Sequence, residues 1–224
     1  MKKFNSLGIL GLGSFSTLFY IEELNCMYQA KMKGYNTFPF KMLNVNFDAI
    51  NRLLPDPSKQ LKDLVQQSIN ELTDLKVDVI LVPNITLHET IDKLNLTVEI
   101  IHPLACTLDE IQKNSCKKIV LIASSYSMNS TYISSHFTKN EIEVILPSEN
   151  EMLFIDTVRK EVYENKASAE NLEKYNSLIE KYAEKSAVVI ACTELSLAFK
   201  STKELEIYDM SRIQILEAIK SFVQ

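Results

Sequence analysis

A cysteine side chain can bind a metal ion, form a disulfide or transfer a proton. The chain contains four of them: Cys26, Cys106, Cys116 and Cys192. Their spacing matches no CxxC metal-binding pattern, and a reducing cytoplasm disfavours disulfides. We interpret the first three as small buried apolar residues. Cys192 differs because it ends an apolar strand and is followed by Thr193 and Glu194, so we consider a functional role for it beside the structural one.

Cys192 also ends one copy of a weak internal repeat. Residues 78–84 (DVILVPN) and 186–192 (SAVVIAC) have equal length, and each follows a long amphipathic helical segment. Each is an apolar strand that ends in a polar residue, so the repeat predicts that Asn84 and Cys192 occupy equivalent strand ends in two similar halves. Ligands of open parallel sheets bind at the carboxyl ends of the strands. The alternative is that any α/β chain contains several such strands.

The elements that must position these residues alternate between short apolar runs and longer helical segments. This order predicts parallel sheets covered on both faces, hence an α/β fold. We expect strands at residues 7–12, 38–47, 77–82, 96–101, 118–123, 142–146, 187–191 and 207–208. We expect helices at residues 14–34, 59–75, 87–94, 108–114, 128–137, 152–164, 168–185 and 210–223.

His102 and Pro103 interrupt this alternation, and we place a domain crossover there. The expected organisation is an N-terminal α/β domain of residues 1–103 plus 208–224 and a C-terminal α/β domain of residues 104–207.

Composition excludes several classes of function. The chain has 224 residues and a net charge of −5, which argues against broad nucleic-acid binding because that needs a basic surface. No apolar run is long enough to span a membrane. The start, Met1-Lys2-Lys3, is not interpreted as a signal peptide, because Ser14 and Ser16 break the apolar run and no cleavage site follows. We therefore expect a cytoplasmic protein.

Four segments in the expected order resemble the aspartate/glutamate racemase superfamily. Residues 191–197 (ACTELSL) resemble the family's GCTEL segment, and residues 7–17 resemble its GIIGGMGPxAT loop. Residues 81–88 (LVPNITLH) resemble the first catalytic segment, CNTxH, and this alignment places Asn84 at the family's first cysteine. Residues 208–211 (YDMS) resemble a late D-[ST]-[ST] segment, although Gln214 stands where a histidine is common.

The resemblance implies two pseudo-symmetric Rossmann-like domains with parallel sheets and an active site in the cleft between them. It implies catalysis without a cofactor or metal, with one cysteine from each domain, on a small-molecule carboxylate or amino acid. Members of the family often form homodimers, and we carry that expectation over.

Racemisation removes the proton at Cα and returns one to the opposite face. Without an electron sink, hydrogen bonds and positive dipoles must hold the carbanion. A thiol suits the proton transfer because its pKa can be tuned toward neutrality. We expect backbone N–H groups at the strand-to-helix turns to bind the carboxylate. Hydroxyl donors at those turns are expected from Thr86, Thr193, Ser124 and Ser125.

The amide at position 84 puts symmetric two-base racemisation in doubt, because it does not titrate. His88, or a water molecule held by Asn84, can serve the empty face. The enzyme can instead work on one face, as in a decarboxylation in which a lone cysteine protonates the carbanion. The third alternative is a non-catalytic protein that binds a small carboxylate. Cys106 is a poor substitute because it lies beyond a different strand.

Several candidate binding residues have a structural and a functional interpretation. Asn84 can cap the following helix, contact the substrate, or do both, and Glu194 can bind substrate or pair locally. The segment with Gly13, Ser14 and Thr17 is either a helix cap or a substrate-binding loop.

Two cations are candidates for binding the distal carboxylate of an acidic substrate. Arg52 and Lys166 are these candidates, and the alternative for each is a solvated surface cation. The sequence therefore predicts a cofactor-independent racemase-type isomerase acting at Cα of a small carboxylate such as aspartate or glutamate, with Cys192 as acid/base. A single-cysteine lyase or a binding protein on the same scaffold are the alternatives.

Overall fold

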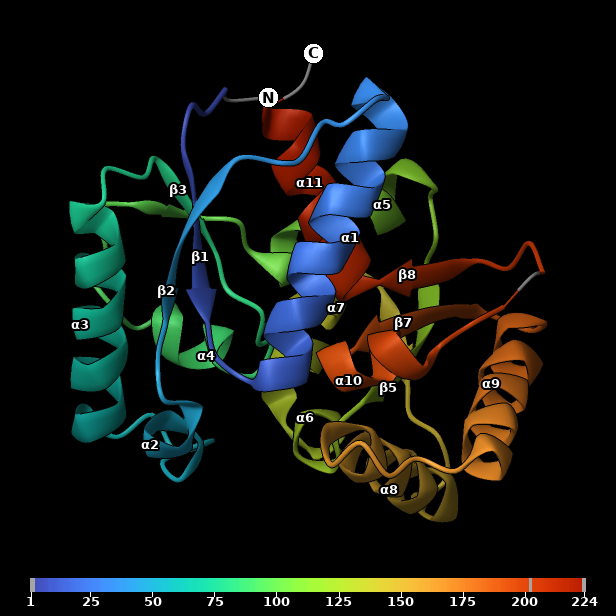
Figure 1. The fold of residues 1–224 in the computed structure, drawn as a ribbon. Helices are drawn as coiled ribbons and strands as arrows, with labels where there is room; N and C mark the ends of the chain where they lie inside the picture. The colour runs from blue at the N-terminus through green and yellow to red at the C-terminus, as the bar shows by residue number, and fades with distance from the viewer. Residues whose placement is uncertain (1–2, 202, 223–224) are drawn as a thin grey trace. The chain divides into compact units, whose positions relative to one another are not determined.

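A computed structural model describes residues 3–201 and 203–222 and divides the chain into two compact units (Figure 1). The first unit contains the chain up to His102 and again from Gln214 onward, and the second runs from Pro103 to Ile213. The expected first boundary, after residue 103, differs from the observed one by a single residue. The expected return to the first domain at residue 208 is corrected to residue 214.

The reason for this correction is the last strand, which belongs to the second sheet. Strand β8 (Ile207–Asp209) pairs in parallel with β7 (Ala187–Ala191). The hydrogen bonds of a strand decide its domain, and in a parallel sheet they join residues that are far apart in the sequence. The predicted end of the last helix, Val223, lies outside the described residues.

The first unit contains a four-stranded parallel sheet with strand order β2-β1-β3-β4. Its central strand, β1, is buried throughout. The elements of this part of the chain are β1 (Leu7–Gly11), α1 (Ser14–Met32), β2 (Phe40–Asn44), α2 (Phe47–Asn51), α3 (Lys59–Asp74), β3 (Val79–Leu81), α4 (His88–Ile91) and β4 (Glu99–Ile100).

Helix α3 covers one face of this sheet because its apolar residues recur at helical spacing. Its buried side chains are Leu61, Val65, Ile69 and Leu72, three or four residues apart, which puts them on one stripe. They pack in one apolar cluster with residues of β1 and β3. Ser58 caps the helix by accepting a hydrogen bond from the Leu61 N–H group.

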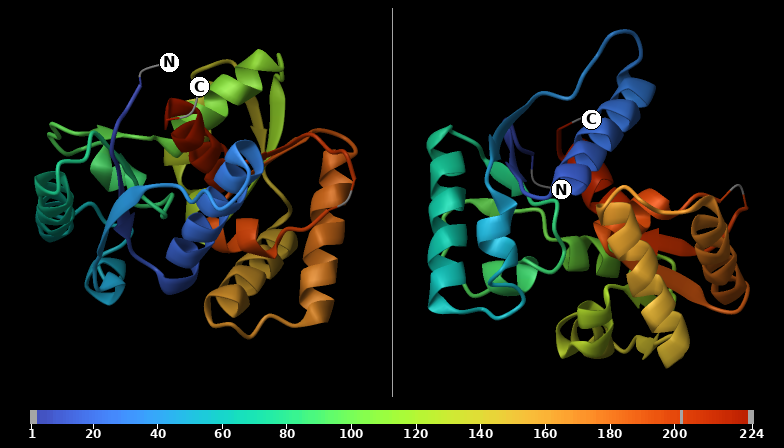
Figure 2. Two further views of the ribbon diagram at one scale, coloured as in Figure 1. Left: turned by 45° about the horizontal axis from the view of Figure 1, so that its top comes forward. Right: turned by 60° about the horizontal axis from the view of Figure 1, so that its bottom comes forward.

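The end of the chain is tied to the first unit by a buried polar contact. Gln214 accepts a hydrogen bond from the Tyr20 hydroxyl at 2.7 Å and donates to the Ile101 carbonyl. Tyr20 lies on α1, so this contact joins α1 to the last helix, α11 (Met210–Phe222). The two helices run side by side in Figures 1 and 2.

The second unit contains a parallel sheet of the same topology, with strand order β6-β5-β7-β8. In each sheet the first strand of the unit lies between the second and third, so β3 and β7 occupy the same place, as the internal repeat predicts. The remaining elements are α5 (Pro103–Lys113), β5 (Lys118–Ala123), α6 (Ser125–Asn129), α7 (Thr131–Thr138), β6 (Glu143–Ile145), α8 (Glu149–Tyr163), α9 (Ala169–Ala183) and α10 (Thr193–Ala198).

Helices flank this second sheet, with α8 and α9 against β5 and β7. Strand β7 is buried at every residue, as expected for a central strand of a covered parallel sheet. Serine side chains start the long helices. Ser168 caps α9 through the Asn171 N–H group, and the Glu151 carboxylate on α8 accepts hydrogen bonds from the backbone and hydroxyl of Ser148.

Three local expectations change. The strand expected at residues 38–47 is limited to β2, and α2 begins at Phe47 because Asn46 accepts a hydrogen bond from the Asp48 N–H group. Pro103 starts a helix, since the first helical position needs no N–H donor. The helix expected at residues 128–137 is divided into α6 and α7 at Ser130. None of the described helices is long and apolar enough to cross a membrane.

Candidate functional site

The two central strands of the second sheet bring two predicted site segments together. Strands β5 and β7 are parallel and in register, with Ala123 opposite Ala191. Ser124 and Cys192 directly follow these paired residues, so both lie at the carboxyl edge of the sheet. This is the edge at which parallel sheets bind ligands.

Cys192 is buried and begins the short helix α10. Its thiol donates a hydrogen bond to the Glu194 carboxylate, with Sγ 3.1 Å from Oε2. Its carbonyl accepts a hydrogen bond from the Ser196 backbone at 2.9 Å. The Ser196 hydroxyl in turn donates to Asp209 at the end of β8. The cysteine therefore sits on a rigid, hydrogen-bonded turn.

Two effects raise the pKa of the Cys192 thiol well above its usual value. The first is burial, and the second is the negative charge and hydrogen bond of Glu194. The Leu195 N–H group and the positive charge of Arg159 act in the opposite direction but are weaker. The thiol is therefore protonated at neutral pH and is poised to donate a proton.

Arg159 is a residue of this neighbourhood that the sequence interpretation missed. It lies on α8, which packs against α10. Burial alone would lower the pKa of its guanidinium, but the hydrogen bond of Asp156 and the charges of the Cys192 thiolate (formed at high pH), Asp156 and Glu194 raise it. No motif marked it, because it lies 33 positions before Cys192 and only the packing of α8 on α10 brings it close.

Asp156 connects Arg159 to the turn after β5. Its carboxylate accepts hydrogen bonds from Arg159 Nε at 2.8 Å and from the Ser125 N–H group at 3.1 Å. Lys160 Nζ lies 2.9 Å from its other oxygen. Burial alone would raise the pKa of Asp156, but these three donors lower it to about 2. The carboxylate is therefore ionised and holds Arg159 in place.

The hydroxyl groups predicted around this edge take part in internal contacts. Ser124 caps α6 by accepting a hydrogen bond from the Ser127 N–H group at 3.2 Å. The Ser211 hydroxyl donates to the buried Thr193 hydroxyl at 3.4 Å. These contacts give both residues a structural role and fix their positions beside Cys192. Substrate binding by Ser124, Ser125, Thr193 and Glu194 stays a prediction.

At the carboxyl edge of the first sheet, Asn84 follows β3 and is partly buried. Its Oδ1 accepts a hydrogen bond from the Leu87 N–H group at 2.9 Å. This hydrogen bond closes the turn before α4, whose own N-cap residue is Leu87, so the bond expected of Asn84 is present one turn before the helix begins. Thr86, also partly buried, lies inside the same turn.

His88 lies four residues beyond Asn84 and is fully buried. Its ring packs edge-on against that of His102, with centroids 4.8 Å apart, and His102 Nε2 lies 3.2 Å from the Asp92 carboxylate. Burial and the charge of His102 lower the pKa of His88 to about 3. A neutral, buried imidazole with so low a pKa remains uncharged at neutral pH and has no contact with solvent through which to exchange a proton.

The loop after β1 lies at the same edge as Asn84, because β1 and β3 are neighbouring parallel strands. Gly13 is buried and precedes α1, and Ser14 is exposed in the first turn of that helix. Thr17 is buried, and its hydroxyl accepts the Leu12 N–H group at 3.0 Å. A side chain at Gly11 would collide with Asn44 Oδ1 at 2.6 Å, so packing accounts for that glycine. Gly13 is the N-cap residue of α1 and no side chain in the described part of the chain caps that helix by a hydrogen bond, so the capping interpretation is not supported, and substrate contact by this loop stays a prediction.

The two predicted carboxylate-binding cations are exposed and paired with neighbours. Arg52 forms an ion pair with Asp48 at 2.6 Å, and 77% of its side chain is exposed. Lys166 pairs with Glu164 at 2.9 Å, and 73% of its side chain is exposed. Both match the alternative of a surface cation.

The interpretation of Cys26 as a buried residue is wrong, because Cys26 is exposed; Cys106 and Cys116 are partly buried.

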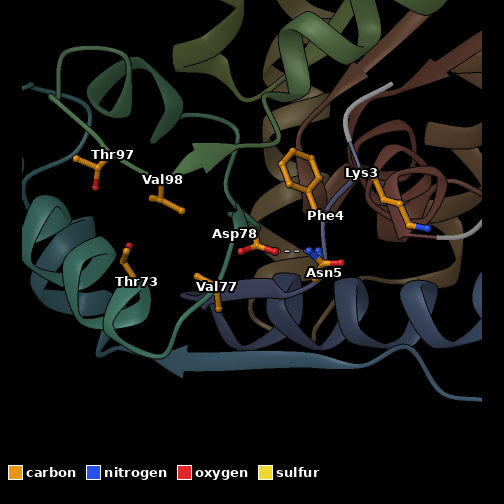
Figure 3. A pocket seen from close by; sticks show the side chains of 8 residues that line it. All are labelled: Lys3, Phe4, Asn5, Thr73, Val77, Asp78, Thr97 and Val98. Carbon is orange, nitrogen blue, oxygen red and sulfur yellow. Dashed lines mark hydrogen bonds between the residues drawn. The ribbon is translucent and has the colours of Figure 1, made fainter.

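The first unit has a cavity of about 420 Å³ at the amino end of its strands (Figure 3). Val77, Asp78 and Val98 line it, and the Asp78 carboxylate already accepts the Asn5 N–H group at 2.8 Å. This cavity lies at the edge opposite to Asn84 and contains none of the predicted site residues. Among the described residues, no cluster of three or more His, Cys, Asp or Glu side chains is arranged to hold a metal ion.

The chain matches a known protein family over nearly its whole length. A model of the Asp/Glu/Hydantoin racemase family matches residues 9–224. The chain therefore belongs to this family. The match spans both units and supports a racemase-type isomerase. A comparison with curated protein sequences found no match.

Solved structures of similar fold include several racemases. A candidate Asp/Glu racemase from Yersinia pestis has a TM-score of 0.82 and 23% identity, with 98% of each chain covered. An aspartate racemase homologue from Pyrococcus horikoshii has a TM-score of 0.83 and 23% identity, also with 98% of each chain covered. An aspartate racemase from Picrophilus torridus has a TM-score of 0.77 and 15% identity, with 96% of this chain and 95% of that one covered. At these identities the similarity establishes the shared fold.

Proposed function

We propose that the protein is a cofactor-independent racemase-type isomerase that acts at Cα of a small carboxylate such as aspartate or glutamate. The observation that carries the proposal is Cys192, a buried thiol at the carboxyl edge of the second sheet and bonded to the Glu194 carboxylate. The family assignment supports the reaction class. Asn84 takes the position of the family's other cysteine and contributes an amide in place of a thiol.

The chemistry follows from the protonation state of Cys192. When a base has removed the Cα proton, the electron pair of that C–H bond becomes a carbanion delocalised into the α-carboxylate. The Cys192 thiol gives its proton to Cα, and the resulting thiolate is stabilised by the nearby positive charge of Arg159. In the reverse direction the thiolate takes the proton back. The amide of Asn84 does not titrate, so the second base is a water molecule or another group.

A second candidate is a lyase in which Cys192 only donates a proton. The raised thiol pKa and the non-titrating amide of Asn84 favour it. In this reaction the bond between Cα and a carboxylate carbon breaks, carbon dioxide leaves, and the electron pair stays on Cα. The thiol protonates this carbanion, and water then returns a proton to the thiolate.

Proton exchange at Cα tests both candidates. The protein is incubated in D₂O with the L- and D-forms of aspartate and glutamate, proton NMR follows the Cα–H signal, and chiral chromatography identifies the products. Cys192→Ala is the test variant. Cys116→Ala is the matched control, because Cys116 is a partly buried free cysteine in the same unit.

Exchange with inversion that is lost only in Cys192→Ala supports the racemase. Exchange without inversion shows proton transfer on one face and favours the lyase. No exchange with any of the four amino acids contradicts the proposed racemase, and the decarboxylase and binding-protein alternatives then lead. We further propose a cytoplasmic homodimer, and light scattering of the purified protein tests its stoichiometry.

A further inference from the structure

The guanidinium group of Arg159 lies near Cys192 and uses only its Nε as a hydrogen-bond donor to the described part of the chain. Its Nε is bonded to Asp156, yet both Nη groups lack a hydrogen-bond partner among the residues that the structure describes. Only 25% of the side chain is exposed, so solvent reaches the group but does not surround it. A guanidinium with its Nη edge open is suited to bidentate binding of a carboxylate.

The position of this cation is fixed by the fold. Asp156 is anchored by the Ser125 N–H group after β5, and it holds Arg159 on the side of α8 that packs against α10. Its side chain therefore need not be ordered when a ligand binds, which lowers the entropic cost of binding. Arg52 and Lys166 offer no comparable site, since both are exposed and paired with neighbouring carboxylates.

We propose that Arg159 binds a carboxylate of the substrate beside Cys192 and is the cation by which this protein selects acidic substrates. This inference rests on the proposed function for the identity of the ligand as a substrate. The carboxylate would use the Nη donors of Arg159, because, among the guanidinium donors, only Nε bonds to the Asp156 carboxylate. A carboxylate at this point lies close to the sulfur that exchanges the Cα proton.

Calorimetric binding of aspartate tests the inference without requiring turnover. L- and D-aspartate and asparagine are titrated into the wild-type protein and into Arg159→Gln, Arg159→Lys and Lys160→Gln. Lys160→Gln is the matched control, because Lys160 follows Arg159 on the same helix and also pairs with Asp156, but 64% of its side chain is exposed. Both Gln variants therefore remove one positive charge and one contact with Asp156.

We expect Arg159→Gln to raise the aspartate Kd about 10- to 100-fold, the range of a lost charge-assisted hydrogen bond. Arg159→Lys is expected to give an intermediate Kd, and Lys160→Gln a Kd within about twofold of wild type. If Arg159 holds the side-chain carboxylate, asparagine binding is unchanged in Arg159→Gln; if it holds the α-carboxylate, asparagine binding weakens as well. The first pattern supports the inference, and the second overturns the role of Arg159 in selecting acidic substrates.

The inference and the proposed function fail in different ways. Unchanged aspartate binding in Arg159→Gln, or an equal loss in Lys160→Gln, overturns the role of Arg159 while leaving exchange by Cys192 intact. Tight binding that depends on Arg159 without any Cα–H exchange overturns the enzyme and keeps the anion site. Failure of the wild-type protein to bind either enantiomer of aspartate overturns the inference. Arg159→Lys keeps the test open should Arg159→Gln fold poorly.

Discussion

Mild acid should destabilise this protein through His88. Its pKa is about 3 in the folded protein against 6.5 for an ordinary histidine. Between these values the unfolded chain binds more protons than the folded one, so stability falls as the pH falls. The full difference between the two pKa values corresponds to roughly 5 kcal/mol in the free energy of unfolding. About 2 kcal/mol of this stability is lost between about pH 7 and pH 5.

This pH range separates His88 from the paired carboxylates. The pKa values of Glu151 and Asp156 are lowered to about 2, so both stay ionised in either state at these pH values. Urea unfolding followed by circular dichroism at both pH values gives the free energy of unfolding for wild type, His88→Gln and His136→Gln. His136→Gln is the control for loss of a histidine elsewhere in the chain.

We expect His88→Gln to be less stable at neutral pH but to lose about 2 kcal/mol less than wild type on acidification. His136→Gln should keep the loss of stability on acidification that His88 causes. Equal acid sensitivity in wild type and His88→Gln would refute the argument that the buried imidazole resists protonation. A supporting result would also explain why His88 cannot serve as a base near neutral pH.

Three further predictions concern the two strand ends. Alkylation of Cys192 by iodoacetamide should need a higher pH than alkylation of an ordinary thiol, because burial and Glu194 raise the pKa of Cys192; Glu194→Gln should move the onset to lower pH, and an onset near neutrality in wild type would contradict the raised pKa. Asn84→Cys should supply the missing base and increase exchange with inversion of aspartate; no gain in a folded variant would argue against placing Asn84 at the family's cysteine position. Asn84→Ala should lower the free energy of unfolding by about 1 kcal/mol, whereas Asn84→Asp should keep the cap to Leu87, and equal stabilities in urea would show that the cap contributes nothing.

The spacing of apolar residues along the chain was enough to predict most of the fold. The apolar strands and the helix stripes of α3 and α9 are visible in the sequence because burial on one face imposes a fixed spacing. The elements whose ends were predicted wrongly include those that begin or end at a single contact. Asn46 starts α2 through one hydrogen bond to the backbone of Asp48, and no periodicity announces so short a helix.

The candidate site was predicted in part. Cys192 and Asn84 stand out because each follows an apolar strand, and the shared topology of the two sheets places β3 and β7 at equivalent positions. Arg52 and Lys166 were chosen as cations by position and type. Their exposure and their neighbouring carboxylates are properties of the folded surface that neither position nor type specifies.

The sequence by itself determined the alternation of strands and helices, the family and the cysteine at the end of β7, because these depend on residues close together along the chain. Only the tertiary structure decided that β8 belongs to the second sheet and that the Cys192 thiol is buried against Glu194. It also decided that Arg159, not Lys166, lies near that thiol. The physical reason is that desolvation and charge pairing depend on distances through space, which are set when α8 packs against α10.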